Sequence, residues 1–350
     1  MPSGHDAAPC DAMSREPFSL LPAPSSLYNQ GHRRRREISG MGERFAYFKK
    51  QIVPLEEAKI GVMTHAFNYG TACFEGIRGN WSDKQEQIFL FRAPEHFQRL
   101  RRSCRILNIS FPYTDEELMD LLVRLVEQCG FNEDVYIRPL AYKSSEMLGV
   151  RLHNLEDDFL MFVTPFGPYL DIEKGARCCT SSWRRVDDLG IPARAKATGI
   201  YINSALAKTE AEMNGFDEAI VLSHDGHVSE GSGENIFVVM NGRLVTPSQA
   251  DNILVGITRD TVIRLAQEEL GMDVEERQID RSELYVADEV FMTGTAAHVT
   301  PIYEIDHRPI GSGAAGPISL KLQRLYFASC LGEIEKYQDW VTPVYTKVRT

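Results

Sequence analysis

Two tight-turn dipeptides constrain the fold of this chain more than any other feature of its sequence. Asp225-Gly226 and Asn241-Gly242 each lie between runs rich in strand-forming residues, which is typical of the two-residue loops that join antiparallel strands. Helical patterns interrupt the strands without the regular alternation of a parallel α/β sheet. These helices are expected at residues 203–214, 258–270 and 318–331. The sequence therefore predicts a mixed fold of the α+β class.

The first half of the chain predicts a unit of its own. Thr114 and Glu117 form a capping-box pattern ahead of a leucine-rich stretch, and residues 94–107 carry apolar side chains at helical spacing. Strands are expected at residues 44–53, 87–91, 135–142 and 159–164, and later at 177–183 and 289–292. From these patterns and the prolines and glycines of residues 165–175, we predict a small α+β domain over residues 41–165, an interdomain loop at 166–175 and a larger domain over 176–345.

Composition argues against several classes of protein. Of the 350 residues, 43% are hydrophobic and 25% are charged, as in an ordinary soluble globular protein. The net charge of −11 disfavours nucleic-acid binding, and no apolar stretch reaches the roughly 18 residues of a membrane span. The seven cysteines lack metal-binding or disulfide spacing. No signal peptide is recognisable, so we expect a cytoplasmic protein without a metal site.

Residues 1–40 differ in composition from the rest of the chain. They hold Ser, Pro, Gly and Asn in irregular order, followed by a run of arginines from Arg33 to Arg36. We predict a disordered tail here, and a nucleic-acid or targeting patch is the alternative for the arginine run. Met41 precedes the first patterned segment and can be a translation start. The function of the tail is not evident from its sequence.

Two segments of the second half combine small residues with one ionisable group. Lys196 lies between Ala195 and Ala197, where a bulky ligand can approach the amine and burial can lower its pKa for attack on a carbonyl. A solvent-exposed lysine explains the same residues. Glu230 lies in the glycine-rich segment 229–235, where a carboxylate can hold the protonated ring nitrogen of a pyridine cofactor. A polar turn is the alternative for this segment.

Two further segments are suited to binding an anion. Thr258 is a good N-cap residue for a helix that follows Gly256, and a helix N-terminus offers backbone N–H groups to a phosphate. Small residues at 293–297 follow an apolar run and can expose N–H groups to a carboxylate or a phosphate. Helix capping and a tight turn, respectively, explain these two segments without a ligand.

Aromatic residues and arginines mark the first half of the chain. Tyr136 and Arg138 share one face of a predicted strand because they are two residues apart, so Arg138 can bind an anionic substrate through both of its terminal nitrogens. Arg99, on the predicted helix 94–107, is a second candidate anion ligand. Core packing with a salt bridge explains the strand equally well, and Arg99 can equally be a surface charge.

Taken in order, these motifs resemble those of the branched-chain amino acid aminotransferases, within the fold type IV family of pyridoxal-phosphate enzymes. The resemblance covers residues 44–341. Its motifs are Tyr-Gly-Thr at 69–71, Phe-Glu-Gly-Ile-Arg at 74–78, Tyr-Ile-Arg-Pro at 136–139, Ser-Glu-Gly-Ser-Gly-Glu-Asn at 229–235, Gly-Ile-Thr-Arg-Asp at 256–260 and Gly-Thr-Ala at 294–296. It implies the fold type IV architecture, in which a small α+β domain precedes a larger domain with a β-barrel-like core. It also implies a homodimer or a hexamer with active sites at the subunit interface.

The resemblance further implies the roles of residues around pyridoxal 5′-phosphate. Lys196 is implied as the lysine that forms a Schiff base and moves the proton between substrate and cofactor. Glu230 is implied as the partner of the pyridine nitrogen, and Tyr201 as a neighbour of the cofactor. The implied phosphate cradle consists of Arg99, Ile257, Thr258 and Thr295.

For the substrate, the resemblance implies one site for the α-carboxylate and another for the side chain. The α-carboxylate is expected at the N–H groups of Thr295 and Ala296 and at the hydroxyl of Tyr136. The side-chain pocket is expected to be lined by Phe74, Tyr201 and, from the neighbouring subunit, Tyr69. Arg138 is implied to bind the distal carboxylate of glutamate, which lets one pocket accept both an apolar and a charged amino acid.

The expected activity is transfer of the amino group of L-leucine, L-isoleucine or L-valine to 2-oxoglutarate in a ping-pong cycle. A D-amino acid transaminase and an aminodeoxychorismate lyase of the same fold are the nearest alternatives, and a non-catalytic scaffold protein is the alternative from another class. Departures from the family pattern at residues 143–150, Phe166 and Thr198 leave the ranking of substrates open. The sequence does not separate biosynthesis from degradation, or a dimer from a hexamer.

Overall fold

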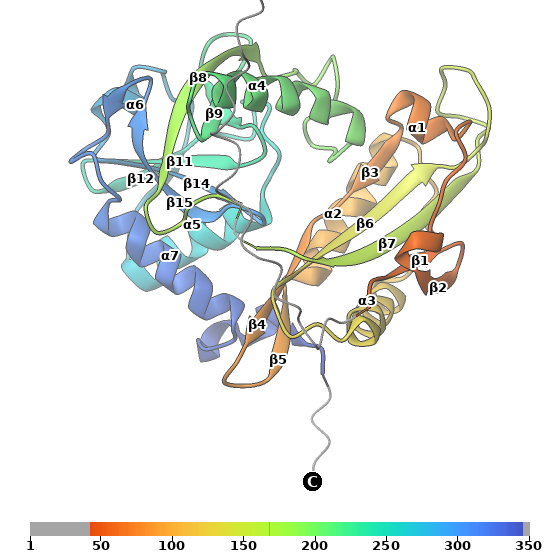
Figure 1. The fold of residues 1–350 in the computed structure, drawn as a ribbon. Coiled ribbons are helices and arrows are strands. Elements are labelled where there is room, and N and C mark those ends of the chain that lie inside the picture. The colour runs from red at the N-terminus through yellow and green to blue at the C-terminus, as the bar shows by residue number, and fades with distance from the viewer. Residues whose placement is uncertain (1–42, 168, 346–350) are drawn as a thin grey trace, which may run out of the picture. The chain divides into compact units, whose positions relative to one another are not determined.

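The strands that the structure describes form two sheets, one of eight strands and one of nine (Figure 1). The structure, a computed structural model, describes residues 43–167 and 169–345, so the predicted tail lies outside the described residues. Helices and strands alternate irregularly along the chain, and the larger sheet curls into a half-barrel. The predicted α+β class is therefore confirmed.

The first sheet is antiparallel at every pair of neighbouring strands. It contains β1 (Phe45–Phe48), β2 (Gln51–Pro54), β3 (Ala72–Phe74), β4 (Ile77–Ser82), β5 (Gln87–Phe91), β6 (Val135–Lys143), β7 (Asp157–Pro165) and β17 (Val341–Pro343). Because β17 pairs with β5, the last described strand of the chain returns to the sheet built by its first half.

Three helices accompany this sheet: α1 (His65–Tyr69), α2 (Ala93–Ile106) and α3 (Asp115–Cys129). The capping box predicted at the start of α3 is confirmed. The hydroxyl of Thr114 accepts the N–H of Glu117 at 3.1 Å, and the Thr114 N–H donates to the Glu117 carboxylate at 2.7 Å. The apolar faces of α2 and α3 are buried together with the central strands in one hydrophobic core.

The single strand predicted at residues 44–53 is wrong, because the chain turns back within it. Lys49 and Lys50 adopt left-handed φ values of 48° and 63°, and β1 pairs antiparallel with β2 across them. Two consecutive left-handed residues make the type of tight turn that matches the twist of a hairpin. Lysine is not a residue typical of such a turn, so the alternating pattern of residues 44–53 gave no indication of the turn.

The second sheet is mixed. It contains β8 (Ala176–Arg184), β9 (Glu218–Leu222), β10 (Val228–Gly231), β11 (Asn235–Met240), β12 (Arg243–Thr246), β13 (Val274–Glu276), β14 (Glu289–Gly294), β15 (His298–Ile305) and β16 (Arg308–Pro309). Both predicted hairpins are confirmed, since β9 pairs antiparallel with β10 and β11 with β12. The loop at Asn241-Gly242 has two residues, whereas the loop around Asp225-Gly226 spans residues 223–227. The neighbours of β8 on either side, β9 and β15, run parallel to it.

The remaining helices are α4 (Tyr201–Met213), α5 (Ile257–Leu270), α6 (Glu283–Val286) and α7 (Pro317–Cys330), with short 3₁₀ turns at η1 (Leu55–Glu57), η2 (Thr198–Ile200) and η3 (Glu335–Trp340). Helices α5 and α7 cover one side of the second sheet and share a core with it (Figure 1). In the part of the chain that the structure describes, no helix has the length and apolar character needed to cross a membrane.

Thr258 does not cap α5 as predicted, because the helix begins one residue earlier. Gly256 is the N-cap residue, with an extended backbone and no side chain to accept a hydrogen bond. A Cβ atom at this position would lie 2.0 Å from Oδ1 of Asn235. Close packing of the loop against β11 therefore requires glycine at the cap, and the first N–H groups of α5 keep no side-chain partner from the cap residue.

Candidate active site

One cavity of about 440 Å³ brings together residues from both sheets and from the loops between them. It collects eleven of the twelve residues that the sequence singled out: Phe74, Arg99, Tyr136, Arg138, Lys196, Tyr201, Glu230, Ile257, Thr258, Thr295 and Ala296. These residues lie up to 222 positions apart in the chain (296 minus 74). Only folding brings them to one site, so the cavity is the candidate active site.

The backbone of Lys196 is fixed to the first sheet and to α2. Its N–H donates to Oγ of Ser103 at 3.1 Å, and its carbonyl accepts the N–H of Phe74 at 3.0 Å. Its side chain enters the cavity, where Nζ donates to the hydroxyl of Tyr201 at 2.7 Å and lies 5.1 Å from the centre of the Phe74 ring. A lysine whose backbone is fixed, and whose amine has one polar and one aromatic neighbour, is suited to reaction with a carbonyl group.

A buried carboxylate, Glu230 on β10, forms another wall of the cavity. Arg185 donates to it at 2.7 Å, and the N–H of Leu254 and the side-chain amide of Asn235 donate at 3.0 and 3.3 Å. Burial raises the pKa of Glu230, while Arg185 acts in the opposite direction. The carboxylate is thus fixed by several donors in a dry position, where it can accept one strong hydrogen bond from a cationic ligand.

Arg99 and the N-terminus of α5 form the positive end of the cavity. Two nitrogens of Arg99 bind the buried carboxylate of Glu75 at 2.7 and 2.8 Å, while Nη1 donates to the carbonyl of Val255 at 2.9 Å. Although burial by itself raises the pKa of Glu75, Arg99 and His96 hold it below its usual value. This end of the cavity joins a guanidinium to the first turn of α5, a combination that suits a phosphate.

Tyr136 and Arg138 extend into the cavity from β6, side by side as predicted. Nη2 of Arg138 donates to the Tyr136 hydroxyl at 3.0 Å, and its guanidinium lies 4.2 Å from the centre of the Phe74 ring. The Phe166 ring packs on Tyr136 at 5.1 Å and lines the same wall. Gly76 is required here, since a Cβ atom would lie 2.1 Å from the Tyr136 hydroxyl.

Tyr69 is the one predicted residue that does not line the cavity. It ends α1, its hydroxyl accepts the N–H of Gly149 at 3.2 Å, and its ring lies 4.7 Å from that of His65. It is 37% exposed. The family resemblance implies that Tyr69 lies in the pocket of a neighbouring subunit, a role that does not require it to face the cavity of its own chain.

Three charged residues around the cavity were not predicted from the sequence: Glu75, Arg185 and Glu234. Burial, with Glu218 nearby, raises the pKa of Glu234 to about 8. Glu75 lies inside the motif Phe-Glu-Gly-Ile-Arg at 74–78, so its position in the sequence could have indicated a place near the site. Arg185 follows another arginine at the end of β8, and nothing in the sequence distinguishes the buried member of that pair from the exposed one.

Comparison with known proteins agrees with this geometry. Residues 72–305 match the family model described as amino-transferase class IV. A probable branched-chain-amino-acid aminotransferase from Aquifex aeolicus is 52% identical over 87% of this chain and 97% of its own length. The branched-chain-amino-acid aminotransferase of Salmonella typhimurium is 40% identical over 86% of this chain and 97% of its own.

Solved structures give the same result. A branched-chain aminotransferase from Thermoproteus uzoniensis with norvaline is similar with a TM-score of 0.83 and 46% identity, covering 87% of this chain and 100% of that one. The PLP form of an enzyme from Thermobaculum terrenum is similar with a TM-score of 0.83 and 37% identity, over 87% and 100% of the two chains. The likeness therefore covers both sheets.

Proposed function

Since this chain belongs to the class IV aminotransferases, we propose that it is a pyridoxal-phosphate-dependent branched-chain-amino-acid transaminase and that Lys196 carries the cofactor. The observation that carries the proposal is the convergence of Lys196, Glu230 and Arg99 on one cavity. The proposed overall reaction moves the amino group of L-leucine, L-isoleucine or L-valine to 2-oxoglutarate.

The donors of the cavity fit pyridoxal 5′-phosphate. The buried carboxylate of Glu230 suits a protonated ring nitrogen, and the amine of Lys196 suits the aldehyde. We propose that a phosphate cradle formed by Arg99, Ile257, Thr258 and Thr295 holds the other end of the cofactor. Thr293, on β14 in the cavity wall, has a buried hydroxyl without a protein partner among the described residues, which is a further polar group available to a ligand.

When bound, the cofactor supplies an electron sink that stabilises negative charge at the substrate Cα. We propose that the amine of Lys196 would take the proton from that carbon and deliver it to the C4′ carbon of the cofactor. The hydroxyl of Tyr201, 2.7 Å from this amine, would hold it in line for both transfers. Glu230 would keep the ring nitrogen protonated, which its fixed and buried position favours.

The opposite side of the cavity fits the substrate. We propose that the N–H groups of Thr295 and Ala296 and the hydroxyl of Tyr136 bind the α-carboxylate, while Phe74 and Tyr201 contact the side chain. Arg138 would bind the distal carboxylate of glutamate. Its guanidinium rests on the Phe74 ring, so it can cover an apolar wall when leucine is bound and meet a carboxylate when glutamate is bound.

We propose a homodimer, with a hexamer as the alternative, in which Tyr69 completes the neighbouring subunit's pocket. Large apolar side chains near Tyr69 are exposed, among them Phe67 at 68%, Leu148 at 62% and Val150 at 89%. Such a patch is typical of a surface that a partner covers. We also propose the division into domains at residues 41–165 and 176–345, and a cytoplasmic location, which free thiols at all six described cysteines favour.

The test of this function is a coupled assay for glutamate formed from L-leucine and 2-oxoglutarate. Lys196→Ala is expected to abolish turnover, because no other lysine is among the described residues that line the cavity; turnover at the wild-type rate would refute the assignment of Lys196. D-alanine as donor, and pyruvate release from aminodeoxychorismate, test the two alternatives within the fold. A chain that binds the cofactor but uses none of these substrates would be the non-catalytic scaffold.

A further inference from the structure

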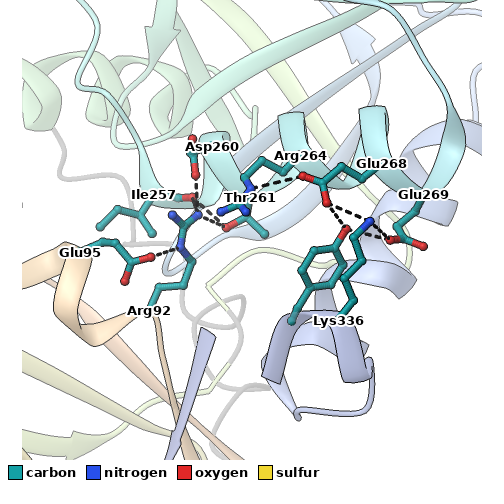
Figure 2. Close-up of polar contacts among 10 residues, drawn as sticks. Arg92, Glu95, Ile257, Asp260, Thr261, Arg264, Glu268, Glu269 and Lys336 are labelled. Atoms are coloured by element: carbon teal, nitrogen blue, oxygen red, sulfur yellow. Dashed lines mark hydrogen bonds and ion pairs between the residues drawn. The ribbon is translucent and has the colours of Figure 1, made fainter. Parts of the chain in front are cut away.

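Arg92 joins two helices that both contribute to the candidate active site. It precedes α2 as its N-cap residue, with a left-handed φ of 49°, and it is buried. Its backbone N–H donates to the carbonyl of Trp340 at 2.7 Å, and its guanidinium lies 5.2 Å from the centre of the Trp340 ring. Nε donates to Glu95 at 2.8 Å. The side chain is therefore held in one direction, toward α5 (Figure 2).

The guanidinium of Arg92 contacts the first turn of α5 at three oxygen atoms. Nη1 donates to the carbonyl of Ile257 at 3.3 Å, to the carboxylate of Asp260 at 2.7 Å and to the hydroxyl of Thr261 at 2.9 Å (Figure 2). The Thr261 hydroxyl in turn donates to the Ile257 carbonyl at 2.9 Å. One arginine thus fixes the backbone of the first turn and pairs with the carboxylate that this turn carries.

The same turn presents Ile257 and Thr258 to the cavity. Arg99, one residue of the proposed cradle, also lies on α2 and donates to the carbonyl of Val255. Helix α2 and its N-cap residue therefore contact the chain on both sides of Gly256. Arg99 binds the residue before Gly256, and Arg92 binds the helical turn after it. Arg99 lines the cavity, whereas Arg92 does not.

We propose that Arg92 is a positioning residue for the cofactor phosphate. The N-terminus of a helix attracts anions, so an unneutralised carboxylate in that turn would repel a phosphate bound to the same N–H groups. Arg92 reduces this repulsion by pairing with Asp260 and sets the direction of the turn. The inference rests on the proposed function, in that α5 must hold the phosphate.

The experiment measures binding of inorganic phosphate and of pyridoxal 5′-phosphate to the full chain by titration calorimetry. Arg92→Gln is expected to raise both dissociation constants by on the order of tenfold. Arg92→Gln with Asp260→Asn is expected to recover much of this loss, because the repelling carboxylate is removed. The KM for leucine, measured at saturating cofactor, is expected to stay within about twofold, whereas a merely structural defect would change it as well.

Arg264 provides a matched control, because it lies on α5, the helix that Arg92 contacts, and over the same indole ring. Its guanidinium is 4.9 Å from the centre of the Trp340 ring. It pairs with Glu268 at 3.6 Å, away from the first turn (Figure 2). Arg264→Gln is therefore expected to leave phosphate binding unchanged. Should Arg92→Gln fail to fold, Arg92→Lys replaces it: lysine keeps the charge but not the fork of donors, and about a threefold weakening is expected.

Thr258→Ala separates the failure of this inference from the failure of the proposed cradle. If Thr258→Ala weakens phosphate binding and the Arg92 variants do not, the role of Arg92 is overturned while the cradle stands. If neither residue affects phosphate binding, the phosphate does not lie at α5, and both assignments are overturned. Weaker binding in the Arg92 variants, with recovery through Asp260→Asn, supports the proposal.

Discussion

Replacing Arg185 with methionine tests the electrostatic design of the cofactor site most directly. The side chains of Arg185 and Glu230 are each 6% exposed and lie 2.7 Å apart. Removing one partner of a buried ion pair costs about 3–5 kcal/mol. Glu230 keeps two other donors, the N–H of Leu254 and the amide of Asn235, so we expect a loss near the lower end, about 3 kcal/mol at neutral pH.

The loss is expected to depend on pH in a definite direction. Burial already raises the pKa of Glu230. When folding raises the pKa of a carboxyl group, the free energy of unfolding of the protein falls as pH rises from the pKa of the unfolded state through that of the folded state. Without Arg185 the pKa of Glu230 in the folded protein rises further, so the protein continues to lose stability up to a higher pH. The destabilisation should therefore be largest at neutral and alkaline pH. It should shrink as pH falls through the reference pKa of glutamate, about 4.3, because Glu230 then becomes protonated in both states.

Urea denaturation of the full chain between about pH 5 and pH 8 measures this effect. The control is Arg184→Met, since Arg184 adjoins Arg185 but is exposed, and its effect should stay within about 0.5 kcal/mol. Combining Arg185→Met with Glu230→Gln should recover stability, because the amide carries no charge to leave unpaired. A destabilisation below about 1 kcal/mol, or one that does not change with pH, would refute the reasoning.

Two further predictions concern the substrate side of the cavity. Gly76→Ala places a Cβ atom 2.1 Å from the Tyr136 hydroxyl, so it should displace Tyr136 and raise the KM for leucine by about tenfold. Gly167→Ala is the control, because a Cβ atom there would have no described heavy atom within 4 Å beyond its chain neighbours. This variant should leave steady-state kinetics unchanged. Arg138→Met should raise the KM for 2-oxoglutarate at least about tenfold and that for leucine at most about twofold, and equal losses for the two substrates would contradict the role given to Arg138.

Local patterns predicted much of this protein because their physics is local. A capping box such as that of Thr114 and Glu117 forms between residues three apart, and two-residue hairpin turns depend only on the residues in the turn and beside it. The class of fold followed from these signals, and the family resemblance followed from motifs with fixed spacing. The turn at Lys49 and Lys50 escaped prediction because its left-handed residues are not ones that favour that conformation.

By itself, the sequence determined the class of fold, the family and eleven residues of the cavity wall, because each of these can be predicted from short local motifs. Only the tertiary structure decided which charges act on them. Arg92, Arg185 and Glu75 are a small part of the many charged residues of this chain, and they matter because folding buries each one beside an opposite charge. Burial and the approach of distant segments set the strength of an ion pair. Neither can be predicted from the sequence immediately around the charged residue.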